Sequence, residues 1–156
     1  ILKSSSPRIS DILLGKFQDQ NMLDSIELIN WTSDFEDHIN LYNKIDIALD
    51  TFPYNGVTTT FEALWMGVPV LTMKGYNFNS RCGSSILKNI NMSELIAKNE
   101  EEYVLKAVEL AKNKKKLLDL RNKIFNHIPD SPLFNHQKFS FDFFDLIRNL
   151  DYFKDN

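Results

Sequence analysis

The sequence contains a single cysteine, Cys82, among 156 residues, so an intrachain disulfide is impossible and a reducing compartment is expected. No apolar run is long enough to span a membrane, and no signal peptide is recognisable. The 18 lysine and arginine residues do not exceed the 21 acidic residues, and the net charge of −3 does not favour the basic face that nucleic-acid binding needs. We therefore expect a cytoplasmic protein that binds neither membranes nor nucleic acid.

Repeats and metal-binding patterns are also missing. No 34-residue helical repeat is visible, so a superhelix of such repeats is not expected within these residues. His127 and His136 do not have the spacing of metal ligands, which predicts no metal site. Hydrophobic residues make up 43% of the chain and charged residues 25%, which is typical of one folded domain rather than a disordered tail.

Strand-like and helix-like segments alternate along the first two thirds of the sequence. Such alternation predicts a Rossmann-like α/β fold, with a parallel sheet and helices on both faces, over about residues 1–110. A helical extension is expected over about residues 111–156. The expected strands are 26–31, 45–50, 68–73 and 95–96, and the expected helices are 6–18, 33–44, 58–66, 81–89, 101–112, 114–126 and 137–153. Ile1–Lys3 reads as the end of a strand, which predicts a fragment of a longer protein.

The most informative segment is residues 46–69, which read DIALDTFPYNGVTTTFEALWMGVP. The pattern predicts a strand, a turn, and a helix that begins at three threonines and stops at Gly67. Such a helix start would lie at the carboxyl edge of the sheet, where its N–H groups and the hydroxyls of Thr58, Thr59 and Thr60 favour an anion. Glu62, one turn below Thr58, suits a sugar hydroxyl. The pattern suggests a nucleoside diphosphate site, although threonines also begin many helices only as caps.

Three further residues are candidates for the same site. Asn55 and Gly56 form a turn in which the backbone can approach a ligand, while ordinary turn chemistry explains Asn55 equally well. Arg81 opens the next helix and is expected at the same edge of the sheet. It would either stabilise a diphosphate leaving group or pair with a buried acid as a structural residue. Cys82 is expected to pack rather than to act as a nucleophile.

Two runs carry a resemblance to a known family. Residues 50–70 (DTFPYNGVTTTFEALWMGVPV) and residues 80–87 (SRCGSSIL) resemble the C-terminal catalytic lobe of the O-linked N-acetylglucosamine transferase family, including its bacterial and SPINDLY-like plant members. The likeness continues through residues 94–97 and 102–103 to residues 131–134, and order and spacing fit from about residue 1 to 150. It implies the C-terminal lobe of a two-lobed GT-B glycosyltransferase.

The resemblance implies roles for individual residues. His38 matches the family histidine that contacts the uracil ring, whereas a nearby family lysine is Phe35 here, which puts the ribose contacts in doubt. From the residues alone, a histidine at this place would be a surface or core-edge residue. Thr58 and Thr59 match the pair that holds the β-phosphate, and Glu62 takes the place of the carboxylate that binds ribose. Thr60 has a weaker claim because family members vary there.

The implied function is transfer of N-acetylglucosamine from a UDP-sugar to serine or threonine hydroxyls of a protein acceptor. The sequence has no Asp-x-Asp pair, which is consistent with metal independence, and no cofactor beyond the donor is implied. The first lobe, its catalytic base and the tetratricopeptide repeats would lie outside this chain, so these residues alone should be inactive and contain no catalytic base. Alternatives are a GDP-fucose or UDP-glucose transferase lobe, and a non-catalytic nucleotide-binding or interaction module.

The last helix is unusually aromatic. Phe139, Phe143, Ile147 and Leu150 form one stripe at helical spacing, while Phe141, Phe144 and Tyr152 fall outside it. One face cannot bury all of these rings. The sequence therefore predicts an exposed apolar patch, or self-association that covers it.

Overall fold

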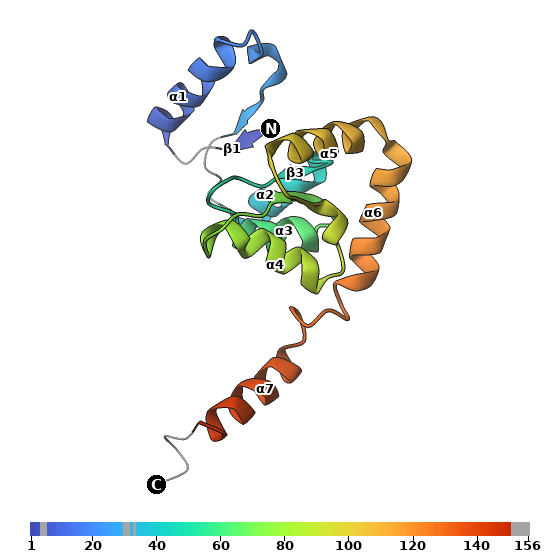
Figure 1. Cartoon of the computed structure of the whole chain (residues 1–156). Helices are drawn as coiled ribbons and strands as arrows, with labels where there is room; N and C mark the ends of the chain where they lie inside the picture. The colour runs from blue at the N-terminus through green and yellow to red at the C-terminus, as the bar shows by residue number, and fades with distance from the viewer. Residues whose placement is uncertain (4–5, 30–31, 33, 151–156) are drawn as a thin grey trace. The chain divides into compact units, whose positions relative to one another are not determined.

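The computed structural model describes residues 1–150 except 4–5, 30–31 and 33 (Figure 1). The chain folds as two compact units that divide between Ile45 and Asp46. Each unit contains its own parallel pairing of strands, as expected for strands that alternate with helices.

The first unit contains one two-stranded parallel sheet and two α-helices. Leu2 pairs with Leu28 and Lys3 with Ile29. Ser6 caps the first helix by accepting a hydrogen bond from the Ile9 N–H, and Pro7 occupies its first turn, where no backbone donor is needed. The elements are β1 (Leu2–Lys3), α1 (Pro7–Gln18), a 3₁₀ turn (Leu23–Ser25), β2 (Leu28–Ile29), α2 (Phe35–Asn40) and a 3₁₀ turn (Leu41–Lys44).

The second unit is built on a three-stranded parallel sheet in the order β3-β4-β5. Ala48 pairs with Val70, and Thr72 pairs with Ile96. The elements are β3 (Ala48–Leu49), α3 (Thr58–Trp65), β4 (Val70–Met73), a 3₁₀ turn (Asn79–Arg81), α4 (Cys82–Asn89), a 3₁₀ turn (Ser93–Leu95), β5 (Ile96–Ala97), α5 (Glu100–Lys112), α6 (Lys114–His127) and α7 (His136–Arg148).

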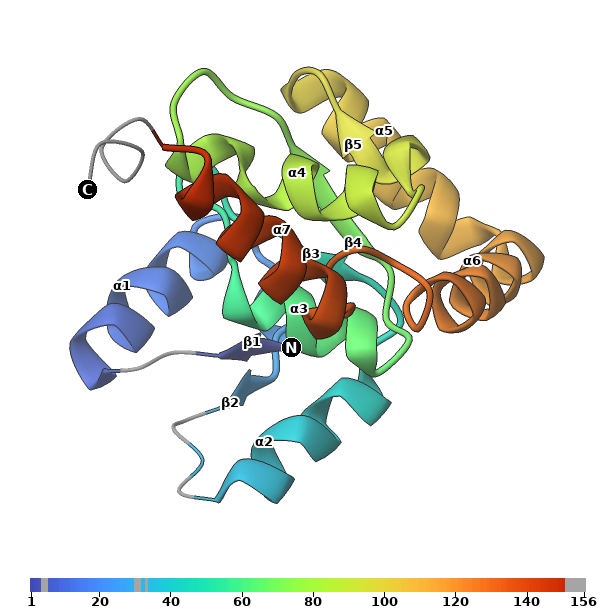
Figure 2. The same ribbon diagram turned by 90° about the horizontal axis from the view of Figure 1, so that it is seen from below.

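The central strand β4 organises the core of the second unit. All four of its residues are buried, as expected for a parallel strand covered on both faces. Figures 1 and 2 show α3 and α4 on one face of the sheet and α5 on the other. Leu64, Leu71 and Leu87 are fully buried between these layers. Truncating such a leucine to alanine costs about 2–5 kcal/mol, so this core fixes where the strands end.

The end of α3 requires a glycine. Gly67 has φ +70°, and its N–H donates to the Leu64 carbonyl at 2.9 Å, which closes the last turn. A Cβ at this position would also run into the Phe125 ring. The chain then turns directly into β4. This tight connection fixes the position of β4 relative to α3.

The predicted α/β class, the parallel sheet and the flanking helices are confirmed, and several boundaries differ. The strand predicted over 45–50 is only Ala48–Leu49, and of the strand predicted over 26–31 the structure shows Leu28–Ile29, with residues 30–31 outside the described part. Ser33, the predicted cap of the second helix, also lies outside it. The cap is Asp34, which accepts from the Glu36 N–H at 2.6 Å. The helix predicted over residues 33–44 ends at Asn40 and continues as a 3₁₀ turn. The division near residue 110 between core and helical extension stays a prediction.

The aromatic helix α7 is exposed as expected. None of its residues is buried, and its exposed side chains include Phe139, Phe141, Phe143, Phe144 and Leu146. Phe139 and Phe143, two members of the predicted stripe, stack with ring centroids 5.9 Å apart. The predicted continuation to residue 153 extends into residues outside the described part. Self-association through this face stays a prediction.

Candidate functional site

The amino end of α3 lacks the side-chain cap that most of the other described helices have. Ser6, Asp34, Asn99, Asn113 and Asn135 each cap a helix by accepting a backbone N–H. The cap position of α3 is Val57, whose side chain has no acceptor. No N-cap side chain therefore bonds to the first-turn N–H groups of α3 at the positive end of the helix dipole. Anion-binding sites use helix starts of this kind.

The three threonines at this helix start do not behave alike. Thr58 and Thr59 are exposed, with hydroxyls and amides at the open end of the helix. Glu62 is half-buried one turn further on, on the face predicted for it. Thr60 is 3% exposed, and its Oγ1 donates to the Gly56 carbonyl at 2.9 Å. The Thr60 hydroxyl therefore fastens the turn to the helix, and a ligand role for Thr60 stays a prediction.

The loop before α3 is held by Asp50, a residue that the sequence analysis did not single out as functional. Its Oδ1 accepts from the Gly56 N–H at 2.7 Å, and its Oδ2 accepts from Thr72 Oγ1 at 2.6 Å. Its backbone carbonyl accepts from the Tyr103 hydroxyl at 2.8 Å. One residue at the carboxyl end of β3 therefore ties together the turn before α3, the central strand and α5.

Burial shifts two pKa values in this cluster. Desolvation raises the pKa of the Asp50 carboxyl above its ordinary value of 3.8, and it outweighs the hydrogen bonds from Thr72 and Gly56, which lower it. Burial raises the pKa of Tyr103 to about 12, with a smaller contribution from the nearby Asp50 charge. Tyr103 therefore stays a neutral hydrogen-bond donor throughout the physiological range.

Asn55 joins the α3 and α4 entry loops. It is 1% exposed, and its Nδ2 donates to the Thr51 carbonyl at 2.8 Å. Its backbone N–H donates to the Asn79 carbonyl at 3.1 Å, and its Oδ1 accepts from the Gly83 N–H at 3.4 Å. Both ends of the side-chain amide bond inside the protein, which favours the turn interpretation, and a ligand contact of Asn55 stays a prediction. Gly56 remains half-exposed beside it.

The start of α4 approaches the same cluster closely. A Cβ on Gly83 would meet the side chains of Thr72 and Asp50, so only glycine allows this approach. Arg81, immediately before the helix, is exposed, and no acidic side chain in the described part of the chain pairs with it. The alternative of a buried structural arginine is therefore wrong, and the guanidinium faces solvent at the helix entry.

Two hollows flank the loop between β4 and α4. One, of about 610 Å³, lies along α4 and is lined by Arg81 together with Val57 and Phe61 from the start of α3. The other, of about 780 Å³, lies at the carboxyl ends of β4 and β5 and is lined by residues such as Phe52 and Lys98. Lys74 and Tyr76 border both. Crevices at this edge of a parallel sheet are where ligands of α/β proteins usually bind.

His38 belongs to the first unit, whereas the other seven predicted site residues belong to the second. It is half-buried on α2, and its ring packs edge-on against Tyr42 with centroids 5.8 Å apart. Lys3 Nζ lies 2.6 Å from His38 Nδ1. The donor and acceptor roles in this contact depend on the tautomer of the imidazole ring. Phe35, at the position of the family lysine, is 73% exposed.

In the described part of the chain, no cluster of three or more His, Cys, Asp or Glu side chains could hold a metal ion. No described helix has both the length and the apolar character needed to cross a membrane. Cys82 is half-exposed, and its Sγ donates to the Phe78 carbonyl at 3.4 Å. Metal independence itself stays a prediction.

Comparison with known proteins identifies relatives of this chain. It is 41% identical over 114 residues to the probable UDP-N-acetylglucosamine–peptide N-acetylglucosaminyltransferase SPINDLY of Solanum lycopersicum, covering 73% of this chain and 12% of that protein. The Arabidopsis thaliana SPINDLY protein matches with the same identity and coverage. The Caenorhabditis elegans UDP-N-acetylglucosamine–peptide N-acetylglucosaminyltransferase is 35% identical over 115 residues, which are 74% of this chain and 10% of that protein.

A solved structure is also similar. A mutant O-GlcNAc transferase of Thermobaculum terrenum matches with a TM-score of 0.84 and 33% identity over 92% of this chain and 28% of that chain. The chain thus spans about a tenth of the length of the curated relatives that it matches. A model of the family described as glycosyl transferase family 41 matches residues 13–143. This chain belongs to glycosyl transferase family 41.

Proposed function

We propose that this chain is the donor-binding lobe of a protein glycosyltransferase that transfers N-acetylglucosamine from a UDP-sugar to serine or threonine hydroxyls. The observation that carries the proposal is the amino end of α3, which has no N-cap side chain and exposes Thr58 and Thr59. The family match and the activities named for the relatives support the same reaction class. The activity belongs to the whole protein, and the isolated chain is inactive.

In this proposal the diphosphate lies against the first turn of α3. Attack of the acceptor hydroxyl on the anomeric carbon breaks the bond to the β-phosphate, where negative charge then accumulates. The N–H groups of the first turn, the hydroxyls of Thr58 and Thr59, and the Arg81 guanidinium stabilise that charge without a metal ion. The hydroxyl proton passes to a base that this chain does not supply.

Two other residues position the nucleotide in this account. Glu62, half-buried one turn below Thr58, accepts hydrogen bonds from the ribose hydroxyls. His38 contacts the base, as the family resemblance implies. Asp50 and Asn55 hold the loop that precedes α3.

A GDP-sugar is the second candidate donor. The resemblance to SPINDLY-like proteins leaves GDP-fucose open as the donor, although the SPINDLY relatives are themselves named as probable UDP-N-acetylglucosamine transferases. The diphosphate chemistry at α3 is the same for both nucleotides. They differ only at the base, so a comparison of UDP with GDP separates the two donors without disturbing the α3 site.

Calorimetric titration of the full-length protein with UDP, GDP and their sugars tests the proposal. A hydrogen bond to a charged group contributes about 1.5–3 kcal/mol, so Thr58→Ala and Thr59→Ala should each weaken nucleotide binding roughly ten- to hundredfold. Thr58→Ser keeps the hydroxyl and should retain most of the affinity. Unchanged nucleotide affinity in both alanine variants would refute the proposed site.

A further inference from the structure

The hollow along α4, called here the α4 cavity, has a group of cationic side chains of which the proposed donor site uses only Arg81. Its cationic side chains are Lys74, Arg81 and Lys88, and no acidic residue lines it. In the described part of the chain, none of the three cations forms a salt bridge with an acidic side chain. On a protein whose net charge is −3, this is a local concentration of unneutralised positive charge.

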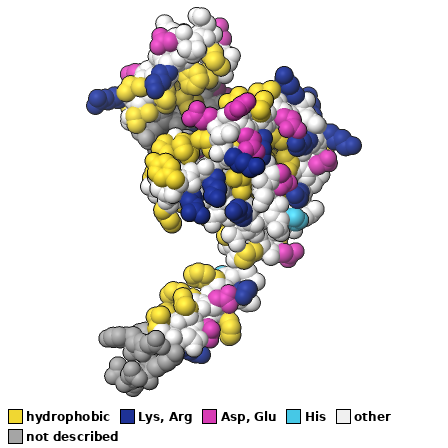
Figure 3. Space-filling model, viewed as in Figure 1, with side chains coloured by type: hydrophobic (Ala, Val, Ile, Leu, Met, Phe, Trp, Pro, Cys, Tyr) yellow, Lys and Arg dark blue, Asp and Glu magenta, His cyan; other side chains and the backbone are white. Residues whose placement is uncertain are grey.

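Aromatic side chains border the same cavity. Tyr76 and Phe78 are 84% and 83% exposed, and Phe61 is half-buried at the α3 side. Figure 3 shows Lys and Arg side chains beside hydrophobic side chains on this part of the second unit. Exposed rings next to unpaired cations form a surface that buries apolar groups and attracts carboxylates at once, as peptide-binding surfaces do.

We propose that the α4 cavity binds an acidic segment of the protein acceptor. The inference rests on the proposed function, because Val57 and Phe61 place the cavity beside the start of α3, where the donor diphosphate would lie. A volume of about 610 Å³ accommodates a few side chains rather than a folded domain. Carboxylates next to the modified serine or threonine would pair with Lys74 and Lys88, and the peptide would lie across Tyr76 and Phe78.

Charge complementarity selects the peptide over other anions. A nucleic acid would need a basic face much larger than three cations on an acidic protein. A second nucleotide would have to bind without the helix N-terminus that the diphosphate uses. An acidic peptide needs only spaced cations and apolar contacts, and the exposed position of Lys74 and Lys88 suits the modest affinity of an acceptor that must leave after reaction.

Fluorescence anisotropy with a labelled pentapeptide, Asp-Glu-Ser-Glu-Asp, tests the inference in the full-length protein. Its neutral counterpart, Asn-Gln-Ser-Gln-Asn, is the peptide control. The acidic peptide should bind at least tenfold more tightly, and this preference should fall as salt rises from about 0.05 to 0.5 M because exposed charge pairs are screened. Equal binding of the two peptides would overturn the inference.

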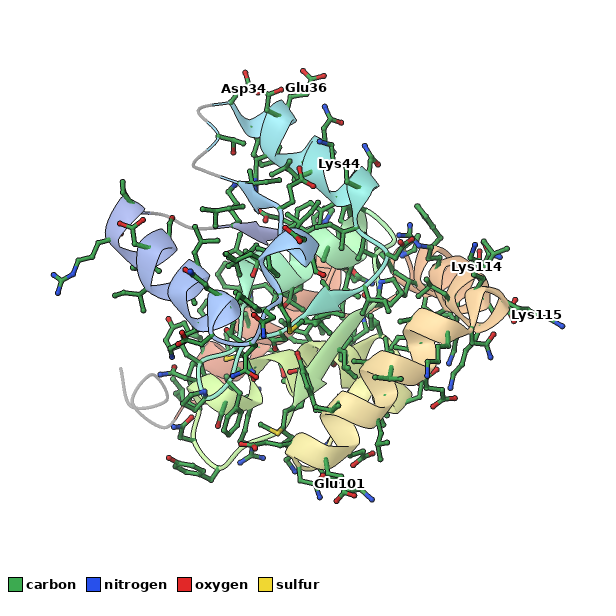
Figure 4. The ribbon with its side chains drawn as sticks, turned by 90° about the horizontal axis from the view of Figure 1, so that it is seen from above. Asp34, Glu36, Lys44, Glu101, Lys114 and Lys115 are labelled. Carbon is green, nitrogen blue, oxygen red and sulfur yellow. The ribbon has the colours of Figure 1, made fainter. Side chains whose placement is uncertain are left out.

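Charge reversal locates the binding surface. Lys74→Glu and Lys88→Glu should each weaken the acidic peptide roughly three- to tenfold, as expected when an exposed attraction becomes a repulsion. Lys114→Glu and Lys115→Glu make the same change in net charge on α6, which contributes nothing to the cavity, and they should leave peptide binding within twofold (Figure 4). An equal loss in the α6 variants would show nonspecific attraction and contradict the proposal.

Nucleotide titration separates this inference from the proposed function. The Lys74→Glu and Lys88→Glu variants should keep the affinity for UDP within twofold. Binding of the acidic peptide without any binding of UDP or GDP would refute the donor site and leave the peptide surface standing. Full displacement of the peptide by UDP would instead show that the cavity is the nucleotide site, and the inference would fail.

Discussion

Replacement of Asp50 should test whether one carboxylate organises both helix entries. Asp50→Ala removes the acceptors of the Gly56 N–H and the Thr72 hydroxyl. Thr72 is fully buried, so leaving its hydroxyl without an acceptor costs about 2 kcal/mol of stability. Water can reach the Gly56 N–H, so the lost hydrogen bond there costs about 1 kcal/mol. We expect the free energy of unfolding to fall by about 3 kcal/mol.

Two matched variants calibrate this prediction. Asp50→Asn keeps an oxygen for Gly56 and turns the Thr72 hydrogen bond around, so it should cost about 1 kcal/mol. Asp46→Ala changes an exposed aspartate at the start of the same segment and should stay within about 0.5 kcal/mol of the natural protein. Urea unfolding followed by circular dichroism gives the free energies, and the exchange rate of the Gly56 amide gives the local effect. A urea midpoint for Asp50→Ala equal to that of the natural protein would refute the reasoning.

The pH dependence of the Asp50 effect follows from its raised pKa. Because the folded state holds the Asp50 proton more tightly than the unfolded chain, this group favours folding most below its ordinary value of 3.8. The contribution is lost as the pH rises through the higher pKa of the folded state. Relative to Asp50→Asn, the natural protein should therefore lose stability as the pH rises through this window. A difference that grows in the opposite direction would contradict the raised pKa.

Two further variants probe the same cluster. Tyr103→Phe removes the hydrogen bond to the Asp50 carbonyl and should cost about 1 kcal/mol at neutral pH, and the advantage of tyrosine should vanish as the pH rises from 10 through about 12 in alkaline unfolding curves. Gly83→Ala would push a methyl group against Thr72 and Asp50 and should destabilise the fold by about 1–3 kcal/mol, although alanine is the better helix former. Gly15→Ala, in an open part of α1, should instead stabilise it by about 0.5–1 kcal/mol. Thermal melts of the two variants measure both effects, and equal effects would contradict this account.

Local signals in the sequence explain how much of the fold was predictable. A turn followed by threonines and a terminal glycine defined α3, and alternation of apolar segments defined the parallel sheet. Strand ends were less predictable, because the residues before Ala48 carry the β-type pattern although the ladder begins only at Ala48. The cap of α2 was misassigned because Ser33 and Asp34 are adjacent residues that can both cap a helix.

Part of the site depends on contacts that no local pattern reveals. Asp50 acts through Thr72, 22 residues away, and Tyr103, 53 residues away. A sequence pattern identifies Asp50 only as the end of a strand. Likewise, the sequence allows Asn55 to be either a turn residue or a ligand contact. Only its hydrogen bonds with Gly83 and Asn79 show that it joins two loops.

The central claim, an anion bound at the amino end of α3, is tested most directly by the backbone amides of that turn. In a two-dimensional ¹H–¹⁵N spectrum of the labelled protein, UDP should produce its largest and saturable shifts at Thr58, Thr59 and Thr60, and uridine, which lacks phosphate, should leave these amides almost unmoved. Shifts of equal size with uridine, or a UDP response confined to residues away from this turn, would contradict the account.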